Sequence, residues 1–322
     1  MNSNNTYYKH TETFELESGE LIQDLKLAYQ IFGTLNSSKT NVVWCFHALS
    51  ANANVLDWWP GLFGKGSYFD PADYFIICVN SIGSPYGSTN PLDHSFPNYT
   101  VRDVVKSQLI LAQHLDINSI QIAIGGSFGG SQALEFAYSY SGQIKQLIII
   151  AAAAQESPWG IAVHEAQRLA LEADSSEDKI AGLKAARAIG MLTYRTVQSL
   201  KDAQQDTDDK TGDFKAASYI NYQGEKFTKR FDAWSYYYLT KCLDSHNLGR
   251  NRGGTAKALA QIQCPALVIG ITSDQLIPIS EVKKMANGIA NGKFYEIESN
   301  YGHDGFLLET TQITQIINHY NN

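Results

Sequence analysis

The apolar positions of the chain form two kinds of pattern, one typical of strands and one typical of helices. Six short segments have the pattern of strands, and the first two are continuous apolar runs of the kind buried on both faces of a sheet: 41–46, 74–79, 120–124, 146–150, 266–271 and 293–298. Between the second and third segments, residues 100–115 carry apolar side chains at helical spacing, with Asp103 in the first turn. Strands that alternate with helices predict a doubly wound α/β fold, with a mostly parallel sheet and helices on both faces.

The pattern changes between residues 155 and 257. Strand signals stop there, and three stretches have helical spacing: 161–174, 177–195 and 231–243. A polar loop at 201–210 lies between the last two stretches. We therefore predict that 155–257 forms a helical cap inserted over the edge of the sheet. Residues 1–154 and 258–322 would then form the α/β core.

A glycine-rich turn follows the third predicted strand. Gly125-Gly126-Ser127-Phe128-Gly129 fits the pattern G-x-S-x-G, and the turn stands between a strand and a helical run. The pattern has a steric reason, because a serine at a strained corner needs neighbours without side chains two residues away on either side. Such a corner exposes the serine Oγ above the N–H groups of the next helix, which favour developing negative charge. An ordinary strand-to-helix turn is the alternative.

A serine at neutral pH is a poor nucleophile, so it needs a base, and the base needs an orienting carboxylate. Asp274 follows the strand at 266–271, and His303 follows the strand at 293–298. These positions reproduce the chain order serine, acid, histidine at the ends of late strands. Apart from His47, the remaining histidines fall in a helix, in the cap, in a loop or near the termini. We predict a triad of Ser127, Asp274 and His303, against the alternatives of a solvated loop acid and a helix-entry histidine.

Two backbone N–H groups would stabilise the negative oxygen formed when such a serine attacks a carbonyl. One belongs to the residue after the nucleophile, Phe128, and the other to the loop after an early strand. His47-Ala48-Leu49 forms that loop, so we expect the second donor to be the N–H of Leu49.

Composition narrows the possible partners. The chain has 322 residues, of which 44% are hydrophobic and 18% charged, as expected of a globular protein with a sizeable core. A net charge of −7 argues against nucleic acid or an anionic membrane as the main partner. Four widely spaced cysteines form no C-x-x-C pair, so we expect neither a metal site nor disulfides, and we expect a cytoplasmic protein.

With these residues placed, the chain resembles the homoserine O-acetyltransferase family of the α/β-hydrolase superfamily. The similar segments span nearly the whole chain: AYQIFGTLN (28–36), HALSANA (47–53), GGSFGGSQALEFA (125–137), ARAIGMLTYRT (186–196), YQGEKFTKRFDAWSYYYLTKCLD (222–244), TSDQLIP (272–278) and YGHDGFLLE (301–309). The resemblance implies an α/β-hydrolase fold and a homodimer formed through the cap. It also implies transfer of an acetyl group from acetyl-CoA, a substrate rather than a bound cofactor, to the hydroxyl of L-homoserine in methionine biosynthesis.

The resemblance also assigns residues. It gives Ser127, Asp274 and His303 the roles of nucleophile, acid and base, and it makes Arg195 and Asp304 the contacts to the amino-acid substrate. Homoserine is a zwitterion, so a guanidinium for its carboxylate and a carboxylate for its ammonium are chemically reasonable. Without the resemblance, a helix-surface arginine and an acid at a helix N-terminus would be the preferred explanations of the last two residues. The residues that contact CoA are not predicted.

Several alternatives stay open. The loop IGSPYGSTNP at 82–91 departs from the Gly-Gly-Cys form of many bacterial members, so the donor could be succinyl-CoA rather than acetyl-CoA. Within the same family, serine could replace homoserine as acceptor. An esterase or thioesterase on this scaffold would use water instead, and a non-catalytic binding protein would use no acceptor.

Overall fold

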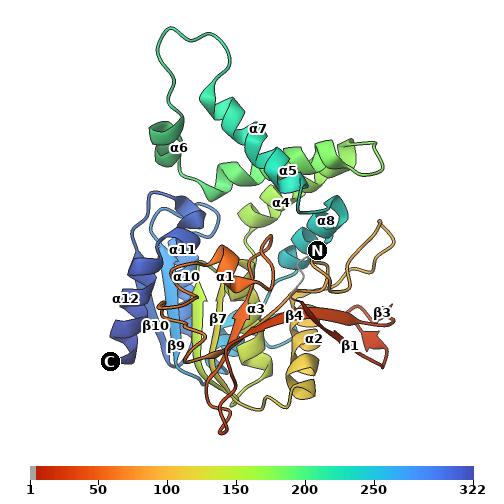
Figure 1. Cartoon of the computed structure of the whole chain (residues 1–322), viewed down its shortest axis with the longest axis vertical. Coiled ribbons are helices and arrows are strands. Elements are labelled where there is room, and N and C mark those ends of the chain that lie inside the picture. The colour runs from red at the N-terminus through yellow and green to blue at the C-terminus, as the bar shows by residue number, and fades with distance from the viewer. Residues whose placement is uncertain (1–4) are drawn as a thin grey trace.

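A mostly parallel sheet of eight strands organises the chain in the computed structural model, which describes residues 5–322 (Figure 1). In spatial order the strands are β1 (Thr6–Lys9), β4 (Lys26–Phe32), β6 (Phe75–Val79), β5 (Val42–Phe46), β7 (Ile120–Gly126), β8 (Ile144–Ile150), β9 (Ala266–Ile271) and β10 (Gly292–Ile297). The strands from β6 to β10 pair in parallel, whereas β1 and β4 are antiparallel to their neighbours. The strands β2 (Phe14–Glu15) and β3 (Leu21–Ile22) pair with each other in a separate two-stranded sheet. All six strands expected from the sequence are present.

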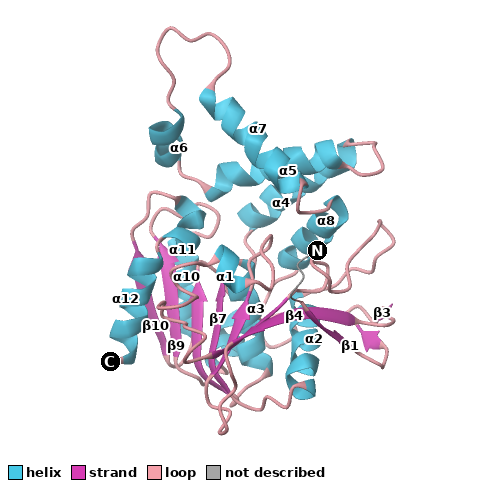
Figure 2. Ribbon diagram, viewed as in Figure 1, coloured by secondary structure: helices cyan, strands magenta, loops and turns pink. Residues whose placement is uncertain are grey.

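The sheet is covered on both faces, as Figure 2 shows. In β5 every side chain is buried, with Trp44 on one face and Cys45 on the other. The Trp44 face packs against α2 (Val101–His114), α3 (Phe128–Ser139), α9 (Thr255–Ala260) and α10 (Ile279–Gly288). The Cys45 face packs against α12 (Thr310–Asn321) and the aromatic segment that follows α1 (Val55–Trp58). Burial on both faces explains why the central strands appear in the sequence as continuous apolar runs.

Five helices follow β8 and lie together above the sheet in Figure 1: α4 (Pro158–Ala173), α5 (Ile180–Tyr194), α6 (Val197–Gln204), α7 (Lys215–Thr228) and α8 (Ala233–Asp244). Three of them match the predicted helical stretches. The helices α6 and α7 were not predicted because they bury few residues: α6 has no buried residue and α7 buries Gly224 and Phe227. The division of the chain into a core and a cap at residues 155 and 257 stays a prediction.

The two ends of this helical segment are joined where they meet the sheet. Gln155 forms an antiparallel bridge with Asn247, the Glu156 N–H donates to the His246 carbonyl at 2.8 Å, and the Leu248 N–H donates to the Ala154 carbonyl at 2.9 Å. The entry and exit of the segment that carries α4 to α8, called the cap from here on, are therefore paired like two short strands.

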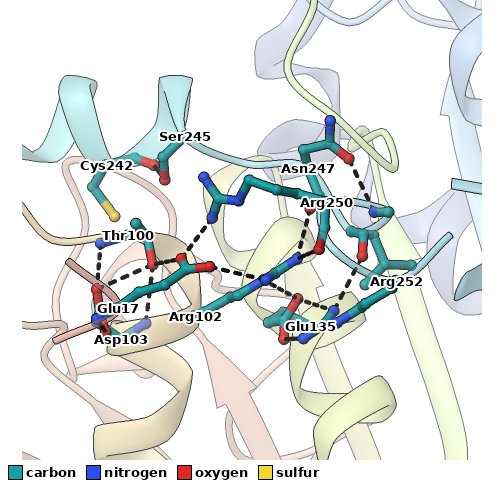
Figure 3. A network of polar contacts seen from close by, with 12 residues as sticks. Glu17, Thr100, Arg102, Asp103, Glu135, Cys242, Ser245, Asn247, Arg250 and Arg252 are labelled. Carbon is teal, nitrogen blue, oxygen red and sulfur yellow. Dashed lines mark hydrogen bonds and ion pairs between the residues drawn. The ribbon is translucent and has the colours of Figure 1, made fainter. Parts of the chain in front are cut away.

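A network of charges fixes the exit segment to the core (Figure 3). Arg252 donates to both carboxylate oxygens of the buried Glu135 on α3, at 2.5 and 2.8 Å. Arg102 on α2 donates to the carbonyls of Asn247 and Arg250 at 3.2 and 2.6 Å, and its guanidinium lies 3.8 Å from Glu135. Since Glu135 lies two turns after Ser127, the same helix carries the candidate nucleophile and the anchor of the cap.

Candidate active site

Ser127 occupies the corner between β7 and α3. Its backbone torsions are φ 56° and ψ −127°, a strained combination for a residue with a side chain. A Cβ atom on Gly125 would lie 2.1 Å from the Gly129 carbonyl oxygen, and one on Gly129 would lie 2.1 Å from the Phe46 carbonyl oxygen. Both flanking glycines are therefore required by close backbone contact, which is the physical content of the G-x-S-x-G pattern here.

Three residues from distant parts of the chain meet at this corner. His303 Nε2 lies 2.7 Å from Ser127 Oγ, and His303 Nδ1 lies 2.7 Å from Asp274 Oδ2. The other oxygen of Asp274 accepts the N–H groups of Leu276 and Ile277, both at 2.9 Å. These bonds fix Asp274, which can only accept when ionised, so the histidine Nδ1 donates and its Nε2 accepts from the serine. The three side chains have the geometry of a nucleophile, a base and an orienting acid, and their catalytic roles stay predictions.

Charge around His303 favours its protonated form. Burial of the imidazole lowers its pKa, but the charge and hydrogen bond of Asp274, followed by the charges of Asp304 and Glu156, outweigh burial and raise the pKa above its ordinary value. In the predicted role of a base, His303 would therefore be stabilised as the imidazolium that forms when it takes the serine proton.

The two predicted oxyanion donors have free N–H groups. The Ser127 carbonyl accepts from Gly130 and Ser131 at 2.8 and 3.1 Å, so the Phe128 N–H on the opposite side of that planar peptide points away from the helix. The Ala48 carbonyl lies 2.8 Å from His47 Nδ1, so the Leu49 N–H likewise points away from the imidazole. Among residues 5–322, neither N–H donates to a protein acceptor.

His47 therefore has a positioning role that the sequence analysis did not assign. Its Nε2 accepts the Ser81 N–H at 2.9 Å, which leaves Nδ1 to donate to the Ala48 carbonyl. Complete burial lowers the pKa of His47 to about 4, against a smaller upward effect of the bond to Ala48, so the ring is neutral at physiological pH. The only sequence signal was its position at the end of a buried strand.

Arg195 and Asp304, which the family resemblance assigns to the substrate, contact each other. Arg195 Nε lies 2.9 Å from Asp304 Oδ2, and the guanidinium stands 5.5 Å from the centre of the Tyr301 ring. Burial raises the pKa of Asp304, and the nearby positive charges of Arg195, His303 and Arg187 partly offset that effect. The two charges are thus adjacent and next to the triad.

A cavity of about 370 Å³ opens onto the serine. The core contributes Ser127, His303, Asp304 and Leu49 to its lining, and the cap contributes His164, Arg187, Tyr194 and Arg230. Sequence reasoning missed these cap residues, because a histidine or arginine on an amphipathic helix carries no signal of its own. No cluster of three or more metal-ligating side chains occurs within residues 5–322. Nor does that part of the chain contain a helix long and apolar enough to span a membrane.

A strained serine after a central strand, with an acid and a histidine after later strands, defines an α/β-hydrolase. The family model described as alpha/beta hydrolase fold matches residues 41–310. The crystal structure of esterase E22 superposes with a TM-score of 0.88 over 99% of this chain and 100% of its own, at 19% identity, a likeness that shows the fold alone.

Two relatives narrow the class to a family. A homoserine O-acetyltransferase of Cyclobacterium marinum is 43% identical, with 95% of this chain and 92% of the relative covered. The crystal structure of homoserine O-acetyltransferase from Staphylococcus aureus has a TM-score of 0.85 at 32% identity, with 99% of this chain and 94% of that chain covered. The chain belongs to the homoserine O-acetyltransferase family, which confirms the resemblance found from its motifs.

Proposed function

We propose that this protein transfers the acetyl group of acetyl-CoA to the side-chain hydroxyl of L-homoserine. The observation that carries the proposal is the pair of 2.7 Å contacts of His303, to Ser127 on one side and to Asp274 on the other, in a member of this family. An acyl transferase and a hydrolase share this chemistry, and only the acceptor of the acyl group differs between them.

The first half-reaction forms an acetyl-enzyme. Ser127 Oγ attacks the thioester carbonyl of acetyl-CoA while His303 Nε2 takes the serine proton. The negative oxygen that results is stabilised by the N–H groups of Leu49 and Phe128. The C–S bond then breaks, the departing sulfur receives the proton from His303, and free CoA leaves.

The second half-reaction uses the same groups in reverse. His303 takes the proton of the homoserine hydroxyl, whose oxygen attacks the acetyl carbon on Ser127. The bond from that carbon to Ser127 Oγ breaks, His303 returns the proton to Ser127, and O-acetylhomoserine is released. Arg195 and Asp304 contact the charged ends of the amino acid, a role supported by their 2.9 Å contact and by the presence of Asp304 with His303 in the cavity lining.

A matrix of assays tests this proposal against its rivals. Acetyl-CoA and succinyl-CoA are each combined with homoserine, serine and water, and release of the free CoA thiol is followed. The proposal predicts fast release with acetyl-CoA and homoserine. Equal release with no amino acid would instead identify an esterase or thioesterase, and preference for succinyl-CoA or serine would identify the other members of the family.

We further propose a homodimer that forms through the cap. Eight large apolar side chains are exposed between residues 159 and 222: Trp159, Ile161, Leu169, Ile180, Leu192, Val197, Phe214 and Tyr222. These exposed apolar side chains belong to one helical segment, and apolar side chains that gather at the surface are typical of an association site. A cytoplasmic location also belongs to the proposal, and it is supported by four cysteines without disulfides and by the use of a CoA thioester.

A further inference from the structure

A second histidine–carboxylate pair lies on the cap side of the cavity. His164 on α4 has its Nδ1 2.6 Å from Asp244 Oδ1 at the end of α8, and the other oxygen of Asp244 lies 2.6 Å from Arg168 Nη2. The His164 and Arg168 side chains are almost completely buried, and Asp244 is largely buried. Burying three such groups is costly unless they are paired, as these are.

His164 and the candidate active site share a cavity. His164 lines the cavity that contains Ser127, His303 and Asp304, and also a smaller cavity beside it that contains Ser127 and Glu156. Asp244 accepts from Nδ1, so Nε2 is the nitrogen available to a ligand, and it has no partner among residues 5–322. In the neutral ring that nitrogen is an acceptor, open to a donor from a bound ligand.

Acceptors from the core and from the cap line the same cavity. Asp304, whose carboxylate contacts Arg195 at 2.9 Å, lines it from the core, and His164, with the Asp244 carboxylate on its Nδ1, lines it from the cap. An ammonium group has three N–H donors, so an α-ammonium bound to Asp304 keeps donors for a second acceptor.

We infer that His164, oriented by Asp244, receives the α-ammonium group of the amino-acid acceptor. This inference rests on the proposed transfer to an amino acid, and it adds a contact from the cap to those of Arg195 and Asp304. The ammonium donates a hydrogen bond to Nε2, and the carboxylate of Asp244 stabilises the positive charge through the imidazole.

The test compares acceptors with and without the amino group. Variant His164→Leu removes the acceptor, and the homoserine analogue 4-hydroxybutanoate lacks the ammonium. We expect the variant to lower kcat/KM for homoserine roughly 10- to 100-fold, as for loss of a hydrogen bond to a charged group, and to change that for 4-hydroxybutanoate less than about 3-fold. The inhibition constant of L-2-aminobutanoate should rise as well, whereas that of butanoate should not.

Two comparisons separate this contact from a structural role. His164→Gln keeps an acceptor oxygen, so it should recover part of the preference for homoserine over 4-hydroxybutanoate that His164→Leu loses. His94→Leu is the matched control, because His94 packs against Trp234 of α8 but lines a different pocket. This variant should leave kcat/KM unchanged for both homoserine and 4-hydroxybutanoate. Equal losses on both acceptors, or an unchanged kcat/KM for homoserine, would overturn the inference. Failure of the wild-type acetyl-enzyme to transfer to any amino acid would overturn the proposed function itself.

Discussion

At the scale of single residues, His303 links the acid to the nucleophile, and its protonation decides whether the site can react. The protonated imidazole cannot take the proton of Ser127, and Asp274 raises the pKa of His303 above the ordinary value of 6.5. Activity should therefore fall as the pH drops through that raised pKa, so the acidic limb of the kcat/KM profile has its midpoint above 6.5.

Asp274→Asn should move that midpoint to lower pH, because it removes the charge that favours the imidazolium. It should also lower kcat by about 10⁴-fold through loss of the correct tautomer. Initial rates measured across the pH range with wild type and variant give both results. An acidic limb that stays in place in the variant would show that His303 does not act as the base.

The sequence predicted some residues of the site and not others for physical reasons. Ser127, Asp274 and His303 could be chosen because each follows a strand in a fixed chain order, so their positions alone carry information. His47 acts through a hydrogen bond that orients the peptide between Ala48 and Leu49, and His164 is one polar residue on an amphipathic helix. Neither role produces a recognisable sequence pattern. Only the fold brings the His47 imidazole to the Ala48 carbonyl and His164 to the cavity that contains Ser127.

At the scale of elements, the loop after β5 depends on one imidazole. His47 holds the Ala48 carbonyl and the Ser81 N–H, and the Gln132 amide joins the carbonyls of His47 and Phe128 at 3.3 and 3.4 Å. We expect His47→Leu to release the Leu49 peptide and to lower kcat about 100-fold, with a smaller change in KM for acetyl-CoA.

His47→Gln serves as the matched comparison, because its amide both donates and accepts and can replace the two bonds of the imidazole. Steady-state kinetics should show that glutamine restores much of the activity that leucine loses. If His47→Leu keeps kcat within about 3-fold of wild type, the Leu49 N–H is not an oxyanion donor.

Elements were predicted where burial produces a pattern. β5 and β9 are buried along their whole length and appear as uninterrupted apolar runs. In contrast, α6 and α7 are mostly exposed, and their polar sequences resemble a loop. Tertiary contacts that bury only Phe227 and Gly224 leave too little periodicity to detect in α7.

At the scale of the whole molecule, the charge network of Figure 3 joins the end of the cap to the core. Glu135→Gln would leave Arg252 beside a neutral amide in a buried site, so we expect it to destabilise the protein by about 3–5 kcal/mol. Glu165→Gln is the control, since Glu165 also pairs with an arginine but has a largely exposed side chain, and it should cost about 0–1 kcal/mol. Urea unfolding measures both, and equal costs would contradict the anchoring role.

If the dimer forms through the cap, charged substitutions on its exposed apolar side chains should dissociate the dimer. Leu192→Asp and Val197→Asp place charges on side chains that are 58% and 76% exposed, so the folded subunit should tolerate them. Light scattering coupled to size-exclusion chromatography should find a wild-type dimer and monomeric variants with unchanged thermal stability of the subunit. A wild-type monomer, or variants that stay dimeric, would exclude this surface as the interface.

The central claim is that an acetyl group passes through Ser127 to an amino acid. Its most direct test is the intact mass of the protein after rapid mixing with acetyl-CoA, followed by addition of L-homoserine. We predict a mass increase of one acetyl group, absent in Ser127→Ala, that persists in buffer and disappears when homoserine is added, with O-acetylhomoserine formed in equal amount. No adduct on the wild type, or one that decays equally fast without homoserine, would contradict the account.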